Sequence, residues 1–383
     1  MKKFWILAAC AATFYACSSS DINTPEFQET GTLQVSTSVL TQNTKGARNT
    51  PSTKADNFNS GPVMGTELAQ GSQIGVFVFN KDSGQTKTSY TGSKNESNAA
   101  LNQTWTNNNE GWKGPEFILG IQPADVYAYF PYIHSASPLS DNTIRPSYDS
   151  IPVAPGYTDY MYGKSTNTVN STSSNANIKL NHALAMISFT FTKGDKYPED
   201  EACQVNAITI NNLPASGTMS VVDGIPTPKI HATGTDTLAL KGFVGNSYIE
   251  SGINGWNIAE FNFKPTDENS NKQIGTVTEN PVVTAPLFHA LVLPNTGMPN
   301  KENITDSELH AVIKIDGVNY KISLSVNKDS SGTNSNENNK WESNKHYTYN
   351  LKINGTSGQG NQLEVSSVTV RQWEQGGSSD IEI

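Results

Sequence analysis

The order of apolar and polar residues along the chain is typical of β-strands. Short runs alternate apolar with polar side chains and are separated by Gly, Asn, Asp, Ser and Pro, which favour turns. The clearest runs cover residues 33–40, 74–80, 126–132, 178–192, 205–210, 287–293, 311–315, 320–326, 346–353 and 365–373. No segment has a sustained helical period. The pattern therefore predicts an all-β protein made of antiparallel β-sandwiches.

One run, from Leu180 to Phe191, is apolar on both of its faces. A strand with this pattern is covered on both sides, so we expect it at the centre of a sheet. The stretch that follows, residues 193–201, is charged, contains proline and is typical of a linker. A chain of 383 residues has the length of about two domains. We therefore predict an N-terminal domain over residues 49–194 and a C-terminal domain over residues 195–383.

Three polar segments predict long exposed loops. They are rich in Asn, Ser, Thr and Gly and cover residues 91–109, 166–177 and 327–339. Within the last of these, residues 329–340 are rich in Asp, Asn and Ser, as calcium loops are. Asn334 stands where a calcium loop needs Gly, however, and Lys340 where it needs a bidentate Glu. We therefore interpret this segment as a solvated hairpin loop.

The first residues predict an exported lipoprotein. Lys2 and Lys3 precede a short apolar run, and Cys17 follows a small residue and begins a polar stretch. Residues 1–16 are then a signal peptide, and Cys17 carries the lipid. Cys10, after Leu7-Ala8-Ala9, is the alternative lipidation site, although it leaves a very short apolar core. Two or more acyl chains would hold the precursor on the outer membrane.

The amino-acid composition limits the partners and the chemistry that we expect of this protein. The net charge is -9 and the sequence pI about 5.2, with acidic residues scattered along the chain, so we expect no nucleic-acid partner. Once the signal is removed and Cys17 lipidated, Cys203 is the remaining thiol, and we expect it to be a small buried side chain rather than a nucleophile.

The chain carries no recognisable catalytic or cofactor motif. It lacks the glycine-rich nucleotide loops, the zinc-protease helix motif and the nucleophile elbow, and its six histidines are dispersed. His182 and His289 lie in apolar strands, where a hydrogen-bonded core histidine is the expected role. We therefore expect no enzyme activity, no cofactor and no metal site.

A group of aromatic residues leaves a second function open. Stacked aromatic side chains could bind a sugar, whereas aromatic residues in strands more often pack in the core. The group consists of Tyr127, Tyr129, Phe130, Tyr132, Tyr157, Tyr160 and Tyr162.

Taken together, these segments resemble the fimbrillin family, the lipoprotein precursors of type V pili, including its Mfa-like branch. The resemblance covers most of the chain and rests on the order and spacing of its segments. They are CSSSD (17–21), TLQVSTSVL (32–40), IGVFVFN (74–80), YAYFPY (127–132), DYMYG (159–163), LNHALAMISFTF (180–191), NKHYTYNLKIN (344–354) and VTVRQWEQGG (368–377).

The resemblance implies two tandem transthyretin-like antiparallel β-sandwich domains and assembly by protease-triggered strand exchange. Residues 17–48 would be a propeptide with a detachable first strand. Its residues Leu33, Val35, Thr37 and Val39 point one way and can plug a hydrophobic groove of the N-terminal domain. Removing this strand would leave a sheet edge that recruits a strand from another chain.

The expected cut follows Arg48 and makes Asn49 the new first residue. Arg48 lies in a polar segment between the first two strong strands, where a trypsin-like protease has access. Lys45 and Lys54 are alternative cleavage sites.

The donated strand is expected near the end of the chain, where two apolar segments flank Gly376-Gly377. The contact would be head-to-tail and would not close. The expected donor residues are Val365, Val368, Val370, Trp373, Ile381 and Ile383.

We therefore expect a structural pilin of a surface fimbrium that supports adhesion and has copies of itself or related pilins as partners. The alternatives are a pilus tip or anchor subunit and a monomeric, tethered lipoprotein that binds a host glycan or protein. The tripeptides 149–151 and 236–238 are candidate O-glycosylation sites.

Overall fold

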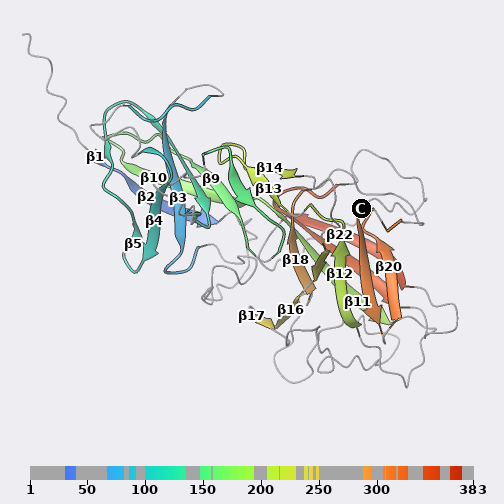
Figure 1. Cartoon of the computed structure of the whole chain (residues 1–383). Coiled ribbons are helices and arrows are strands. Elements are labelled where there is room, and N and C mark those ends of the chain that lie inside the picture. The colour runs from blue at the N-terminus through green and yellow to red at the C-terminus, as the bar shows by residue number, and fades with distance from the viewer. Residues whose placement is uncertain are drawn as a thin grey trace, which may run out of the picture.

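The protein is an elongated all-β molecule, as a computed structural model of the whole chain shows (Figure 1). The labelled strands β1 to β5 and β10 gather at one end, β11, β12, β18, β20 and β22 gather at the other, and β13 and β14 lie between them. The structure describes residues 31–39, 67–81, 86–91, 100–134, 147–156, 158–193, 205–214, 216–229, 237–239, 241–244, 247–249, 288–294, 305–306, 308–315, 318–326, 340–353 and 363–372.

A seven-stranded sheet forms the N-terminal half, in the order β2-β10-β9-β7-β3-β4-β5. Beside it, β1 pairs with β6. The strands are β1 Gly31–Thr32, β2 Gln34–Val39, β3 Gln73–Asn80, β4 Gln103–Asn108, β5 Gly111–Lys113, β6 Ile118–Leu119, β7 Ala124–Phe130, β9 Met161–Ser165 and β10 Asn175–His182.

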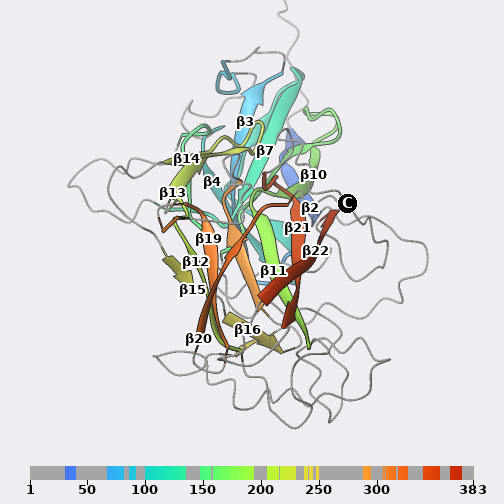
Figure 2. The same cartoon turned by 90° about the vertical axis from the view of Figure 1, so that its right-hand side faces the viewer.

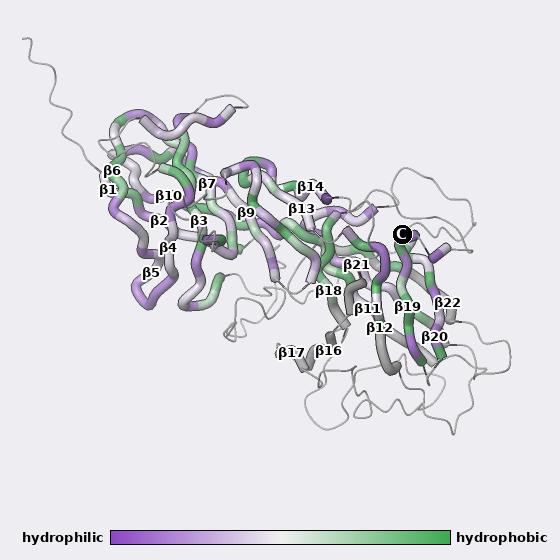
Figure 3. Tube along the Cα trace, in the orientation of Figure 1, coloured by the Kyte–Doolittle hydropathy of each residue, from purple (hydrophilic) through white to green (hydrophobic). Residues whose placement is uncertain are grey.

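The central strands of this sheet are buried on both faces. Along β3, Val76 and Val78 belong to the N-terminal core, whereas Phe77 and Phe79 belong to a second core on the opposite face. This follows from the strand geometry, because successive side chains point to opposite faces. Figure 3 shows the same alternation of hydrophobic and hydrophilic residues along many strands.

Two packed sheets form the C-terminal half. The six-stranded sheet has the order β17-β16-β18-β11-β21-β22, and the four-stranded sheet has the order β15-β12-β19-β20 (Figure 2). A core between them takes side chains from both sheets, among them Phe189, Ile313 and Tyr349. The strands are β11 Ala185–Lys193, β12 Val205–Asn211, β15 Thr237–Ala239, β16 Lys241–Val244, β17 Ser247–Ile249, β18 Phe288–Val292, β19 His310–Ile315, β20 Val318–Ser323, β21 Lys345–Ile353 and β22 Leu363–Gln372.

A third core joins the two halves. It packs Phe77 and Tyr129 of the N-terminal sheet with Met186 of β11 and Leu291 of β18. Backbone hydrogen bonds cross the same region, since Gly156 and Leu291 exchange both N–H···O contacts, at 2.8 and 3.0 Å. A three-stranded sheet, β14-β13-β8, adds a further connection; its strands are β8 Ile151–Val153, β13 Ser216–Met219 and β14 Pro226–Lys229.

The long apolar run at residues 178–192 forms two strands rather than the single central strand that we predicted. β10 ends at His182 in the N-terminal sheet, and β11 begins at Ala185 in the C-terminal one. The run is apolar throughout because Ala183 and Leu184 cross through the core that joins the halves. The chain thus changes sheets before residue 194, our predicted domain boundary, and the division into domains stays a prediction.

The pairing is mostly antiparallel, with two parallel exceptions. β2 lies parallel to β10, and β11 lies parallel to β21. Both pairs join strands far apart in sequence, which alternation within a strand cannot reveal. The loop predicted at residues 91–109 was also partly wrong, because β4 forms there and buries Trp105.

A buried tyrosine connects three parts of the C-terminal half. The Tyr349 hydroxyl donates to the backbone oxygen of Leu324 at 2.7 Å and accepts from Nε1 of Trp341 at 2.9 Å. Burial raises the pKa of Tyr349 well above its ordinary value, so the hydroxyl keeps its proton.

We expect Tyr349→Phe to lower the free energy of unfolding by about 2 to 4 kcal/mol, because it leaves a buried donor and a buried acceptor unpaired. Urea unfolding followed by tryptophan fluorescence measures the loss. Tyr132→Phe is the control, since the Tyr132 hydroxyl has a long, exposed contact with His134, at 3.5 Å. Equal midpoints for the two variants would contradict the expectation.

Candidate functional site

The strand β2, which we predicted to be detachable, lies at an edge of the N-terminal sheet. β2 pairs with β10 in parallel through six residue pairs and is the terminal strand in the sheet order. Leu33, Val35 and Val39 are buried in the N-terminal core, and Thr37 on the same face is half-buried. The apolar side of this strand is therefore part of the core, although its backbone is at a sheet edge.

The opposite end of the sheet curls round to meet β2. Trp112 of β5 donates from Nε1 to Oγ1 of Thr37 at 3.0 Å, although β5 and β2 are the two ends of the strand order. On the other side, Oγ of Ser36 donates to Oδ1 of Asn177 in β10 at 2.7 Å. β2 therefore fills the seam of a nearly closed sheet.

The start of the strand is held by backbone contacts. The Leu33 N–H donates to the Phe117 oxygen at 2.8 Å, and β1 pairs with β6 next to it. Gly31 fits tightly there, because a Cβ on this residue would lie 2.4 Å from the backbone oxygen of Ser171. A side chain at this position would push the strand out of its place.

Removing β1 and β2 would uncover a groove. Its floor is apolar and includes Ala176, Ile178 and Leu180 of β10, together with Trp112 and Phe117. Its rim is the edge of β10, whose backbone groups would lose the partners that β2 supplies. Such an edge is a template for another strand. The four residues that we predicted for a detachable strand therefore lie together on one face of β2, against the N-terminal core.

The predicted donor strand forms part of the chain's own C-terminal half. β22 is an edge strand that pairs with β21 along its length, with a register shift between Asn350 and Leu351. Val368 is buried in the core, Val370 packs against it, and Val365 pairs with the buried Leu351. The remaining predicted site residues, Cys17, Arg48, Asn49, Trp373, Ile381 and Ile383, lie outside the described residues.

The aromatic residues considered as a sugar surface are mostly used in packing. Tyr127, Tyr129 and Phe130 are buried, and Tyr132, Tyr160 and Tyr162 are partly buried against the core that joins the halves. Tyr157 lies outside the described residues. The ring of Tyr162 also lies on Gly224, which has a φ of +67°; a Cβ there would be 2.1 Å from the ring.

Two histidines have partners that could suggest catalysis. Nδ1 of His182 lies 3.0 Å from both carboxylate oxygens of Asp159, and both side chains are 1 % exposed. Oγ of Ser188 lies 2.6 Å from Nε2 of His346, and Ser188 is fully buried. The expectation of a hydrogen-bonded core histidine at His182 is confirmed.

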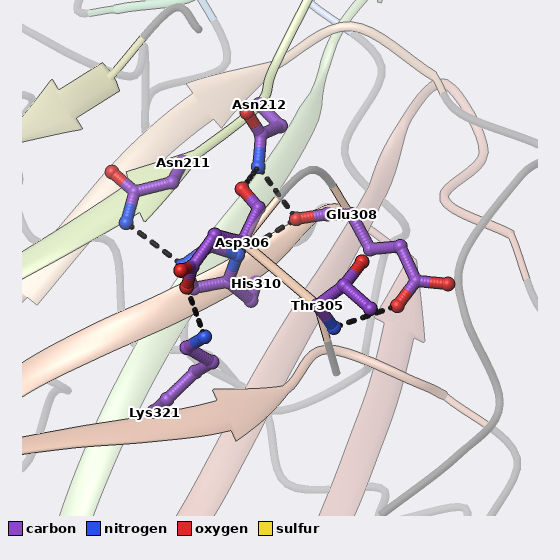
Figure 4. A network of polar contacts seen from close by, with 7 residues as sticks. All are labelled: Asn211, Asn212, Thr305, Asp306, Glu308, His310 and Lys321. Carbon is purple, nitrogen blue, oxygen red and sulfur yellow. Dashed lines mark hydrogen bonds and ion pairs between the residues drawn. The ribbon is translucent and has the colours of Figure 1, made fainter. Parts of the chain in front are cut away.

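A polar network lies beside β12 and β19 (Figure 4). Nδ2 of Asn212 donates to the backbone oxygens of Asp306 and Glu308, both at 2.7 Å. Nδ1 of His310 donates to the Glu308 oxygen at 2.7 Å, and its Nε2 accepts from Asn211 at 3.1 Å, as a neutral imidazole does. The hydrogen bonds anchor the turn before β19.

A charged pair continues this network. Lys321 binds the carboxylate of Asp306 and lowers the pKa of that exposed group, first through the hydrogen bond and then through its charge. The pair joins the turn to β20 at the surface, where the Asp306 side chain is 92 % exposed. We interpret the role of the whole network as structural: it holds the turn before β19 in place.

Among the described residues no group of three or more His, Cys, Asp or Glu side chains could hold a metal ion. In the same part of the chain, no helix has the length and apolar character needed to cross a membrane.

A comparison with family models decides the identity. The model described as fimbrillin-like matches residues 53–373, most of the chain. The chain belongs to the fimbrillin-like family. It is therefore a fimbrial, adhesion-type protein of the cell surface that assembles with other fimbrial subunits, and it is not an enzyme. The predicted family is confirmed.

Solved structures of fimbrial and adhesion proteins are similar to this fimbrillin-like chain. A proposed cell adhesion protein from Bacteroides ovatus is 12% identical, with a TM-score of 0.49, over 88% of this chain and 97% of that chain. One from Bacteroides uniformis is 15% identical, with a TM-score of 0.45, over 79% and 92%. The tip fimbrial protein Mfa3 from Porphyromonas gingivalis is 10% identical, with a TM-score of 0.41, over 80% and 95%.

Because these TM-scores lie below 0.5, we base family membership on the sequence match alone. A comparison with curated protein sequences found no match. The matched range begins after β2, so the family match does not include this strand.

Proposed function

We propose that this fimbrillin-like protein is a structural pilin whose first strand is removed by a protease and replaced by a strand of another subunit. The observation that carries the proposal is the position of β2, a sheet-edge strand with Leu33, Val35 and Val39 buried in the core. β2 has a full ladder on one side only, so another strand can pair with the same edge of β10 once β2 has left.

The energetics fit a strand that is stable until it is cut. Three buried side chains contribute at most about 5 to 9 kcal/mol. As part of the chain, β2 binds its groove intramolecularly and at high effective concentration. A cut in the segment after β2 makes the binding of β2 intermolecular and removes the high effective concentration. β2 can then leave, and a second strand can bind. Parallel pairing, which is slightly less stable per residue, makes β2 easier to replace.

Export and anchoring complete this proposal. A lipid on Cys17 would hold the precursor on the outer membrane, and the cut would free the mature subunit together with its groove. Residues 17–48 would act as the propeptide. We also propose that the two halves of the molecule are the tandem transthyretin-like domains that the family resemblance implies.

The donated segment is best placed after β22. Donating β22 itself would remove Val368 and Val370 from the subunit's own core, which would cost about as much as the new contact gains. Residues 373–383 follow β22, and Ile381 and Ile383 alternate with polar residues as a groove-filling strand requires. We therefore propose these residues as the donor.

Cleavage after Arg48 is tested by Arg48→Ala. We expect the exported variant to stay uncut and monomeric under a trypsin-like protease that converts the wild type to polymer with Asn49 as its first residue. N-terminal sequencing and light scattering measure the two effects. Lys45→Ala and Lys54→Ala are matched controls and should polymerise normally. Polymer formation by Arg48→Ala would show that the cut lies elsewhere or is not needed.

A further inference from the structure

One side chain of the groove, Trp112, can distinguish between strands that bind there. Trp112 is 8 % exposed and belongs to the same core as Leu33, Val35 and Val39, and its Nε1 donates to the Thr37 hydroxyl at 3.0 Å. An indole N–H can only donate, so it needs an acceptor at this place. A strand with an apolar side chain there would leave the donor buried and unpaired, which is penalised.

We propose that Trp112 selects a side-chain hydroxyl at the position of Thr37 in any strand that replaces β2. We further propose that residues 376–383 of a second copy supply this hydroxyl through Ser379, by entering antiparallel to β10. Both statements rest on the proposed strand exchange, and they add to it a specificity-determining residue, a register and a direction.

The register follows from the sequence of the donor segment and the pairing of β10. Thr37 lies opposite Ile178, so Ser379 takes its place opposite Ile178. In the antiparallel direction the alternate residues on the same face then fall on the positions that β2 buries. Ile381 takes the place of Val35, Ile383 that of Leu33, and Gly377 that of Val39.

The parallel direction fits less well. With Ser379 again opposite Ile178, only Ile381 would reach an apolar position, that of Val39. Gly377 and Gln375 would then stand at the positions of Val35 and Leu33, which are deeply buried. Using Ser378 instead moves the segment by one residue and turns both isoleucines away from the groove.

The change of direction also favours exchange. β2 is parallel to β10, and an antiparallel strand forms the slightly stronger ladder. This gain partly offsets the missing side chain at the position of Val39, where the donor has Gly377. The space that the Val39 side chain would leave lies next to Leu180. It is at the end of the groove near the end of β10, where the chain crosses to the C-terminal sheet.

Labelled synthetic peptides test the selection without altering the fold of the subunit. The full chain is cut with a trypsin-like protease, and binding of the peptide 376–383 is followed by fluorescence anisotropy while light scattering follows polymer growth. We expect Ser379→Ala in the peptide to weaken binding by about 5- to 150-fold, Ser379→Thr to bind like the wild type, and Ser378→Ala to change binding little.

The groove side is tested with Trp112→Phe in the full chain. This variant should bind the wild-type and Ser379→Ala peptides about equally, because the donor that distinguishes them is gone. Equal binding of the two peptides to the wild-type groove would overturn the selection by Trp112. If the cut wild-type protein forms no polymer although its groove still distinguishes the two peptides, the result would instead count against strand exchange as the assembly mechanism.

Disulfide trapping tests the direction. Lys179 is exposed on β10, and in the proposed register it lies opposite Ser378, whereas a parallel strand would place Asp380 there. In chains with Cys203→Ser, Lys179→Cys should therefore cross-link with Ser378→Cys of the next subunit and not with Asp380→Cys, because directly opposite residues have the Cα separation that a disulfide needs. The reverse preference would overturn the antiparallel direction.

Discussion

Val35→Asp is expected to release β2 from its groove in the uncut precursor. Val35 is buried in the N-terminal core, so the variant loses a buried apolar side chain and places a carboxylate among Ile178, Trp112 and their neighbours. The combined cost is at least about 3 kcal/mol, which lowers the equilibrium constant for docking of β2 in its groove by more than about a hundredfold. The precursor should then expose the edge of β10 without any protease.

Hydrogen exchange and light scattering measure this effect. Amides of residues 33–39 and of β10 should exchange faster in Val35→Asp, and the uncut protein should self-associate. Ser38→Asp is the matched control, since it adds the same charge to the exposed face of the same strand. If Val35→Asp protects β10 as the wild type does, β2 contributes little to covering the groove, and the proposed exchange loses its physical basis.

Loss of the buried histidine should be the largest single effect on stability. His182→Leu leaves the Asp159 carboxylate buried without the imidazole that lies 3.0 Å away. Breaking such a pair on one side costs about 3 to 5 kcal/mol. The pair lies where β10 ends and the chain crosses to β11, so the loss should also loosen the connection between the two halves.

A double-mutant cycle separates the pair from the packing around it. Asp159→Asn in the His182→Leu background removes the buried charge and should recover much of the lost stability in urea unfolding. His134→Ala, at an exposed histidine, should change stability by about 0.5 kcal/mol or less. A small loss for His182→Leu, or no recovery in the double variant, would show that the pair is not important for folding.

Much of the fold could be predicted from local pattern. The alternation of apolar and polar residues located β3, β12, β19 and β21 closely, because each strand has its own period of two. The same pattern showed that Leu33, Val35, Thr37 and Val39 share a face. Family membership was also within reach, since the order of the segments resembles fimbrillins and the fimbrillin-like family model matches.

Pairing partners and burial depended on contacts that are distant in sequence. Ser36 and Asn177 are 141 positions apart, and no local signal placed β2 parallel to β10. The apolar run at residues 178–192 gave the same pattern for one central strand as for two strands that meet at a crossing. The hydrogen bond from Trp112 to Thr37 joins the two ends of a curled sheet, which only the closed sheet brings together.

The sequence by itself therefore determined which side chains of a strand face the same way, where the chain turns, and the family to which it belongs. The tertiary structure alone decided that β2 is an edge strand filling a seam, that β22 serves its own core and that the aromatic group is packing. The physical reason is that strand periodicity is set by the local backbone. Whether a strand lies at an edge, fills a seam or belongs to the core depends on which distant strands pair. This pairing is determined only when the whole chain has packed.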